Sequence, residues 1–101
     1  MRNGFMYILL CGNGTYYTSS TIDLDLRLEQ HKAGEGSNHT KKYQPVELVY
    51  FEEFELVADA FKREKQVQGW GRKKKEALIN SRPDLLVELS KRKTKKDITK
   101  S

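Results

Sequence analysis

The feature that most constrains the fold is an uninterrupted apolar run over residues 5–11, which ends at the triplet Gly12-Asn13-Gly14. Seven β-forming residues have the length of a buried strand and are far too few to cross a bilayer. Glycine and asparagine tolerate positive φ, so the triplet predicts a tight turn. Residues 15–18 are then expected to return as the second strand of a hairpin.

The segment after the hairpin has the features of a helix. Ser20, followed three residues later by Asp23, forms a capping box with a shortened acid, and Gly34 is a typical C-terminal stop. These signals predict a helix over residues 22–33. Residues 34–44 are polar and rich in turn formers, so they predict a loop.

The second half of the chain predicts one strand followed by helices. Residues 46–54 alternate with the period of a strand, and the side chains expected on its buried side are Val46, Leu48, Tyr50 and Phe54. Helices are expected over about 56–68 and 72–79. The apolar stripe of the first is Val57, Ala60, Phe61 and Val67. A short final helix would contain Leu85, Leu86 and Leu89. The order β-β-α-β-α-α predicts an α+β domain with a mostly antiparallel sheet.

Length and composition limit the class of protein. The chain has 101 residues, enough for one domain, which we expect to span residues 1–90, with a basic and disordered tail at 91–101. The single Cys11 cannot form an internal disulfide, and no Cys/His cluster has the spacing of a zinc site. The apolar run leads into a turn rather than a cleavage site. We therefore expect a soluble, cytoplasmic protein.

Positive charge is concentrated in the second half. Residues 1–61 carry a net charge of −4 and residues 62–101 carry +9. Such a charge attracts polyanions by neutralising phosphates and releasing counterions. The basic run that follows Trp70 is the candidate nucleic-acid-binding segment, with Arg72, Lys73, Lys74 and Lys75. The alternative is an ordinary solvated face with a charged tail.

Three features are not explained by packing alone. Glu64 completes the apolar stripe of its helix, where an unpaired carboxylate would cost several kcal/mol. Arg27 and His31 are four residues apart on one helical face, a pair suited to an anionic oxygen. Tyr7 and Tyr17 lie in partner strands, and a phenol accepts a proton only if nearby cations lower its pKa. Taken singly, each has a structural alternative: a rim ion pair, a helix flank and strand packing.

At these residues the sequence resembles the GIY-YIG nuclease superfamily, over roughly residues 5–80. Its two-part motif is matched by Phe5-Met6-Tyr7-Ile8-Leu9 and Tyr16-Tyr17-Thr18-Ser19-Ser20-Thr21. The following helices and strand entry are matched by residues 23–34, 41–50, 60–67 and 69–79. The chain is similar to the small standalone bacterial members. The resemblance implies a three-stranded antiparallel sheet flanked by helices, in agreement with the predicted order of elements.

The resemblance also implies hydrolysis of DNA phosphodiester bonds with one divalent ion, Mg²⁺ or Mn²⁺. Tyr7 and Tyr17 take the positions of the two motif tyrosines, Arg27 that of the family arginine, and Glu64 that of the metal-binding glutamate. His31 would orient Tyr7 or relay a proton. The attacking water must lose a proton, to a tyrosinate or with help from the metal, and either tyrosine could be the base.

The sequence departs from the family pattern in the second half of the motif, where Ser19 replaces the usual glycine. A side chain there is expected to affect activity more than fold, because glycine allows close backbone approach. Asn80 is assigned to a family asparagine on loose spacing. A catalytically weakened nucleic-acid-binding module and a protein–protein adaptor are therefore kept as alternatives. DNA repair and defence against mobile elements both stay open.

Overall fold

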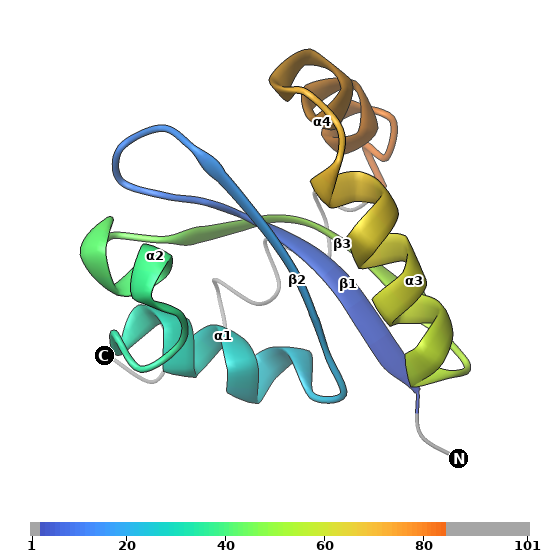
Figure 1. Ribbon diagram of the computed structural model, residues 1–101, viewed down its shortest axis with the longest axis horizontal. Helices are drawn as coiled ribbons and strands as arrows, with labels where there is room; N and C mark the ends of the chain where they lie inside the picture. The colour runs from blue at the N-terminus through green and yellow to red at the C-terminus, as the bar shows by residue number, and fades with distance from the viewer. Residues whose placement is uncertain (1–2, 85–101) are drawn as a thin grey trace.

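A three-stranded antiparallel sheet of order β2-β1-β3 forms the centre of the molecule, and helices flank it (Figure 1). The computed structural model describes residues 3–84. Within that range the elements are β1 (Gly4–Leu10), β2 (Tyr16–Thr21), α1 (Leu24–Lys32), α2 (Asn38–Lys42), β3 (Glu47–Phe54), α3 (Val57–Gln68) and α4 (Arg72–Asn80). The expected α+β fold is confirmed, with one short helix, α2, added to the expected order.

The central strand β1 is buried on both faces. It pairs antiparallel with β2 along one edge and with β3 along the other. Because successive side chains of a strand point to opposite faces, β1 contributes to two separate cores. The core on the α1 side contains Tyr7, Leu9, Cys11, Leu24, Leu28, Val46 and Leu48. The core on the α3 side contains Met6, Ile8, Tyr50 and Val67.

The side chains of β3 switch from one face of the sheet to the other part-way along the strand. Tyr50 pairs with Ile8, whereas Leu48 pairs with Leu9, so Val49 is an extra residue in β3. Such a bulge reverses the alternation of side chains on its two sides. Leu48 therefore packs in the α1-side core and Tyr50 in the α3-side core. The prediction that both lie on one side of the strand is wrong, because simple alternation does not include a bulge.

The hairpin between β1 and β2 forms as expected. Gly14 has a φ of 83° and its N–H donates to the carbonyl of Cys11 at 2.9 Å, which closes the turn. The return strand is longer than predicted and continues to Thr21. Ser20 therefore lies inside β2 and cannot cap the next helix.

Helix α1 starts two residues later than predicted. Its N-cap is Asp23, whose side chain accepts a hydrogen bond from the backbone N–H of Leu26 at 3.1 Å. The predicted capping box is wrong because Asp23 is itself the cap. The predicted stop is confirmed, since Gly34 has a φ of 78° just after the helix.

The segment predicted to be a loop contains helix α2. Ser37 is its N-cap, and the Ser37 hydroxyl and Thr40 form a capping box with reciprocal hydrogen bonds. A capping box with threonine in place of glutamate or glutamine is a weak sequence signal, and five residues are too few for helical periodicity. The loop prediction for residues 34–44 is therefore wrong at its centre.

Helix α3 is rotated relative to the predicted stripe. Its buried residues are Ala60, Glu64 and Val67, whereas Val57 and Phe61 are 41% and 52% exposed. The small Ala60 faces the sheet because the helix passes close to β1, where the backbone of Val57 lies against Gly4. The predicted burial of Val57 and Phe61 is wrong, while the predicted core-facing position of Glu64 is confirmed.

Some expectations fall outside the described residues. The predicted final helix with Leu85, Leu86 and Leu89, and the basic tail at 91–101, both lie there. Within residues 3–84 no helix has the length and apolar character of a membrane span. Cys11 is buried as a free thiol.

We predict that Gly4→Ala destabilises the fold by about 1–3 kcal/mol, because an added Cβ would lie 2.6 Å from the Val57 Cα and force α3 away from the sheet. The measurement is urea unfolding followed by circular dichroism. Gly69→Ala is the matched control, since its Cβ would meet only the Gln66 carbonyl at an ordinary 3.5 Å. Equal midpoints for the two variants would contradict the close packing of α3 on β1.

Candidate active site

A buried hydrogen-bonded chain connects β1, α1 and α2. The phenol of Tyr7 lies 2.8 Å from Nε2 of His31, and Nδ1 of His31 lies 2.8 Å from Oγ1 of Thr40. Tyr7 is 1% exposed, and His31 and Thr40 are completely buried. The three side chains come from three different elements, so only the folded chain brings them together.

The hydroxyl of Thr40 lies between His31 and the N-cap of α2. It is within hydrogen-bond distance of the carbonyl and the backbone N–H of Ser37, both at 3.2 Å, and of the Ser37 hydroxyl at 3.1 Å. When the Thr40 hydrogen goes to the Ser37 carbonyl, Nδ1 of His31 donates to Thr40 and Nε2 accepts a hydrogen bond from the phenol of Tyr7. Burial, and secondly the charge of Arg27, lower the pKa of His31 from 6.5 to about 4. At neutral pH the ring is therefore uncharged.

Tyr17 and Arg27 complete this cluster. The ring of Tyr17 meets the ring of His31 edge-on at 5.5 Å between centroids and stacks on His39 at 5.9 Å. Arg27 is half-buried, donates to Oε1 of Gln30 at 3.0 Å, and contributes to the pKa shifts of both Tyr7 and His31. The four positions predicted for catalysis, Tyr7, Tyr17, Arg27 and His31, thus lie together on the α1 side of the sheet.

Tyr7 is a poor proton acceptor in this setting. Burial raises the pKa of Tyr7, and the hydrogen bonds from Ser19 and Arg27 offset only part of that increase. The Arg27 cation does lower the pKa of Tyr7, but by less than burial raises it. The phenol of Tyr7 is hydrogen-bonded to Nε2 of His31, whereas Tyr17 is only half-buried and within reach of solvent.

Glu64 is 7% exposed and is held by uncharged donors from two directions. Its Oε1 accepts from the hydroxyl of Ser20 at 2.5 Å, and its Oε2 accepts from Nε2 of Gln68 at 2.7 Å. The ammonium of Lys65 lies 3.8 Å from Oε2 on a largely exposed side chain. The rim ion pair considered from the sequence is thus present but long, and most of the contacts to Glu64 come from neutral groups.

The carboxylate of Glu64 and the tyrosine cluster lie on opposite faces of β2. Ser19 pairs with Tyr7 and points to the α1 side, whereas the next residue, Ser20, pairs with Met6 and points to α3. β2 is an edge strand of the sheet, and α1 and α3 lie on either side of it (Figure 1). A ligand that contacts both groups would therefore pass around the edge formed by β2.

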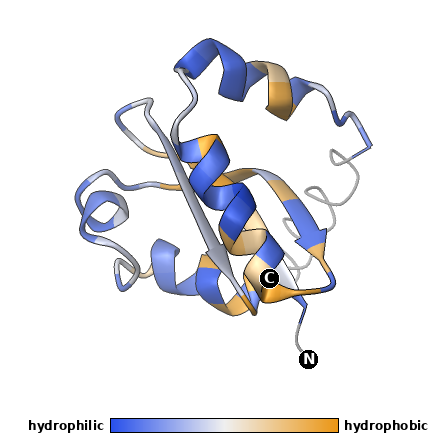
Figure 2. Ribbon diagram, turned by 45° about the vertical axis from the view of Figure 1, so that its right-hand side comes forward, coloured by the Kyte–Doolittle hydropathy of each residue, from blue (hydrophilic) through white to orange (hydrophobic). Residues whose placement is uncertain are grey.

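The basic run forms the first turn of α4. Lys73 and Lys74 are exposed, Lys75 is half-buried, and Arg72 is anchored by a hydrogen bond to the carbonyl of Gly14 in the hairpin turn. Asn80 is the exposed last residue of α4, and no contact to the other candidate residues is observed for it within residues 3–84. This part of α4 is hydrophilic, whereas its last turn is apolar (Figure 2).

The comparison with protein families identifies the family of the chain. The model of the GIY-YIG catalytic domain matches residues 3–77. The chain belongs to the GIY-YIG family. The described GIY-YIG domain therefore has a nuclease-type fold, and GIY-YIG nucleases as a group use divalent metal ions and bind nucleic acids.

Similar proteins include small chains of the same type. A UPF0213 protein of Staphylococcus aureus is 40% identical over 82 residues, which is 81% of this chain and all of the relative. The solution structure of the UPF0213 protein BH0048 from Bacillus halodurans is 36% identical, with a TM-score of 0.51 over 77% of this chain and 83% of that one. The structure of EF2693 from E. faecalis is 30% identical, with a TM-score of 0.55 over 80% and 86%.

From the sequence we did not identify several residues that contact the candidate site of this GIY-YIG domain. They are Ser20, Gly36, Ser37, His39, Thr40 and Gln68. Gly36 leaves space for the imidazole, since a Cβ there would overlap the ring of His31. The threonine capping box that starts at Ser37 was the one available signal for α2, because the other roles depend on contacts between distant segments.

We predict that the GIY-YIG domain loses stability as pH falls from about 6.5 to about 4, because its His31 has a folded-state pKa below its unfolded value. In that window the unfolded chain binds more protons, so the free energy of unfolding decreases, by roughly 2–3 kcal/mol at the lower end. Urea unfolding at pH 7, 5.5 and 4 measures the change. His31→Gln, which lacks the titrating ring, should show a shallower dependence, and identical slopes would contradict this prediction.

Proposed function

We propose that this chain is a metal-dependent endonuclease that hydrolyses DNA phosphodiester bonds with Mg²⁺ or Mn²⁺. The observation that supports it best is the joint position of Tyr7, Tyr17, Arg27 and His31, the four positions with which the family resemblance associates the chemistry. As part of the same proposal, the nuclease domain spans residues 1–90 and acts in the cytoplasm.

In this proposal each polar side chain has a role that follows from its burial and its contacts. Arg27 binds a phosphate oxygen and stabilises the charge that develops on the phosphorus centre. Tyr17, which solvent can reach, first loses its phenolic proton to solvent and then, as the tyrosinate, receives the proton of the attacking water. Tyr7 is buried and hydrogen-bonded to neutral His31, so it holds the site in shape rather than accepting that proton.

Glu64 fits the role of a single protein ligand to a divalent ion. Within residues 3–84 no cluster of three or more His, Cys, Asp or Glu side chains is present, so water and phosphate oxygens would complete the coordination shell. Ser20 and Gln68 orient the carboxylate without neutralising it. On the same face of β2, the buried hydroxyl of Thr18 has no hydrogen-bond partner among residues 3–84. A bound ion would stabilise phosphate charge and acidify a water molecule.

The second candidate is a catalytically weakened nucleic-acid-binding module, and the position of Ser19 supports it. Ser19 stands opposite Tyr7 on the edge strand, and its hydroxyl contributes to lowering the pKa of the phenol. A phosphodiester that crosses this edge would meet a side chain where the family pattern has glycine. A displacement of about 1 Å is enough to reduce catalysis about 100-fold.

We predict that Glu64→Ala reduces metal-dependent nicking of plasmid or branched DNA by at least about 100-fold, because the only proposed protein ligand is lost. Gel analysis of nicked product at several Mg²⁺ and Mn²⁺ concentrations gives the rate. Glu55→Gln, at an exposed glutamate, is the matched control and should leave the rate unchanged. Cleavage that survives Glu64→Ala would remove the assignment.

We predict opposite effects for the two adjacent serines. Ser19→Gly should raise the nicking rate about tenfold, because it removes a side chain from the edge of β2 where the phosphodiester would pass. Ser20→Ala should lower the rate about 10–100-fold, because the Glu64 carboxylate loses the hydrogen bond that orients it. Rates on the same plasmid substrate measure both. A salt-dependent gel shift with no cleavage by the wild type or by Ser19→Gly would instead favour the binding module.

A further inference from the structure

Trp70 follows the C-terminal end of α3 and packs against one of the two cores. Its backbone N–H donates to the carbonyl of Val67 at 3.0 Å, and its ring packs against the α3-side core. The residue as a whole is half-buried. A ring fixed in this way presents an aromatic surface at little further cost in conformational entropy.

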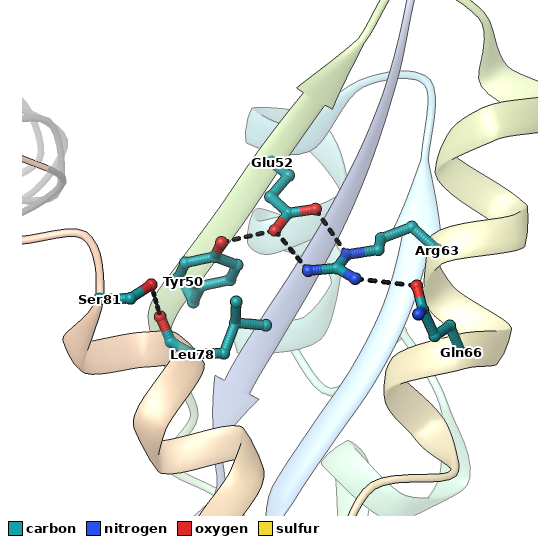
Figure 3. Close-up of polar contacts among 6 residues, drawn as sticks. All are labelled: Tyr50, Glu52, Arg63, Gln66, Leu78 and Ser81. Atoms are coloured by element: carbon teal, nitrogen blue, oxygen red, sulfur yellow. Dashed lines mark hydrogen bonds and ion pairs between the residues drawn. The ribbon is translucent and has the colours of Figure 1, made fainter.

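Two cations lie over the Trp70 ring, and they differ in how they are held. The guanidinium of Arg63, 5.2 Å from the ring centroid, donates to both oxygens of Glu52 and to Gln66 (Figure 3). The ammonium of Lys74 lies 4.4 Å from the centroid. No hydrogen bond or ion pair ties Lys74 within the described part of the chain, so Lys74 can leave the ring while Arg63 stays.

A cation also lies over a second aromatic ring, that of Tyr16. The guanidinium of Arg72 lies 4.7 Å from the centroid of Tyr16, and both side chains contact Glu76. Tyr16 packs on the same core as Trp70. The first turn of α4 therefore places cations over two rings that rest on one core. Residues 62–84 carry eight basic and three acidic side chains, so phosphate groups are attracted to this surface.

The chemistry that matches alternating rings and cations is a nucleic-acid strand with exposed bases. Phosphates pair with Lys and Arg, while the face of a base stacks on an aromatic ring. In a duplex both faces of each base are covered by its neighbours, so only an unpaired or extruded base can reach the indole. Arg63 and Glu64 are consecutive residues of α3, but Arg63 binds Glu52 of β3 whereas Glu64 binds Ser20 of β2.

We propose that Trp70 is the stacking platform for an unpaired base of the DNA substrate, and that Lys74 moves from the ring to an adjacent phosphate when the base binds. This inference rests on the proposed function for its choice of DNA. It narrows the substrate class to single-stranded, branched or otherwise unpaired DNA.

The experiment uses the fluorescence of the full chain, in which Trp70 is the only tryptophan. A 15-nucleotide oligothymidine is titrated in EDTA, beside a duplex and an abasic oligonucleotide of the same length. We expect saturable quenching with oligothymidine and little quenching with the abasic strand, although its charge is equal. Equal quenching by the two strands would overturn the proposal, because the signal would then report charge alone.

Variants measured by fluorescence anisotropy of labelled DNA complete the test. Trp70→Ala should weaken binding of the single strand by about 5- to 150-fold and leave duplex binding nearly unchanged, whereas Trp70→Phe should retain most of the affinity. Phe61→Ala is the matched control, since it removes another cation–π pair of α3, with Lys65, outside the basic run. Equal losses on both DNA forms, or full affinity in a folded Trp70→Ala variant, would overturn the proposal.

The outcomes also separate this inference from the proposed function. Nicking activity that survives in a chain without base-dependent quenching would remove only the stacking platform. Base-dependent quenching in a chain that cleaves no DNA with either metal would remove only the endonuclease assignment and leave a binding module for unpaired DNA.

Discussion

Burial of β1 on both faces determines where each candidate side chain lies. Four consecutive residues, from Met6 to Leu9, are almost completely buried, and they alternate between two cores. This arrangement requires pairing partners on both edges and a helix on each face. Tyr7 therefore belongs to the α1 side together with His31, while Ile8 supports α3 and, through it, the position of Glu64.

The edge strand β2 extends this division into the site. Ser19 and Ser20 are neighbours in sequence but point to opposite faces, one toward the phenol of Tyr7 and one toward the carboxylate of Glu64. The hydrogen bonds on the two sides are thus set by a single register between β1 and β2. A shift by one residue would exchange the two serines, so the chemistry at both groups depends on the accuracy of the hairpin.

Charge is distributed in a way that complements this arrangement. The tyrosine cluster contains one half-buried guanidinium and a neutral imidazole, whereas the cations of α4 lie on the solvated surface and on aromatic rings. Cations at the surface attract a strand from a distance, and Arg27 acts only at short range. Long-range attraction and local recognition are therefore supplied by different residues.

The sequence by itself determined the hairpin, the order of the main elements, the family and the core-facing position of Glu64, because turn residues, periodicity and motif spacing are local properties. Tertiary structure decided the bulge at Val49, the rotation of α3 and the bonds of His31 to Tyr7 and Thr40. It also decided that Glu64 and the tyrosines lie across β2 from each other. These features depend on contacts between segments far apart in the chain, which no local pattern records.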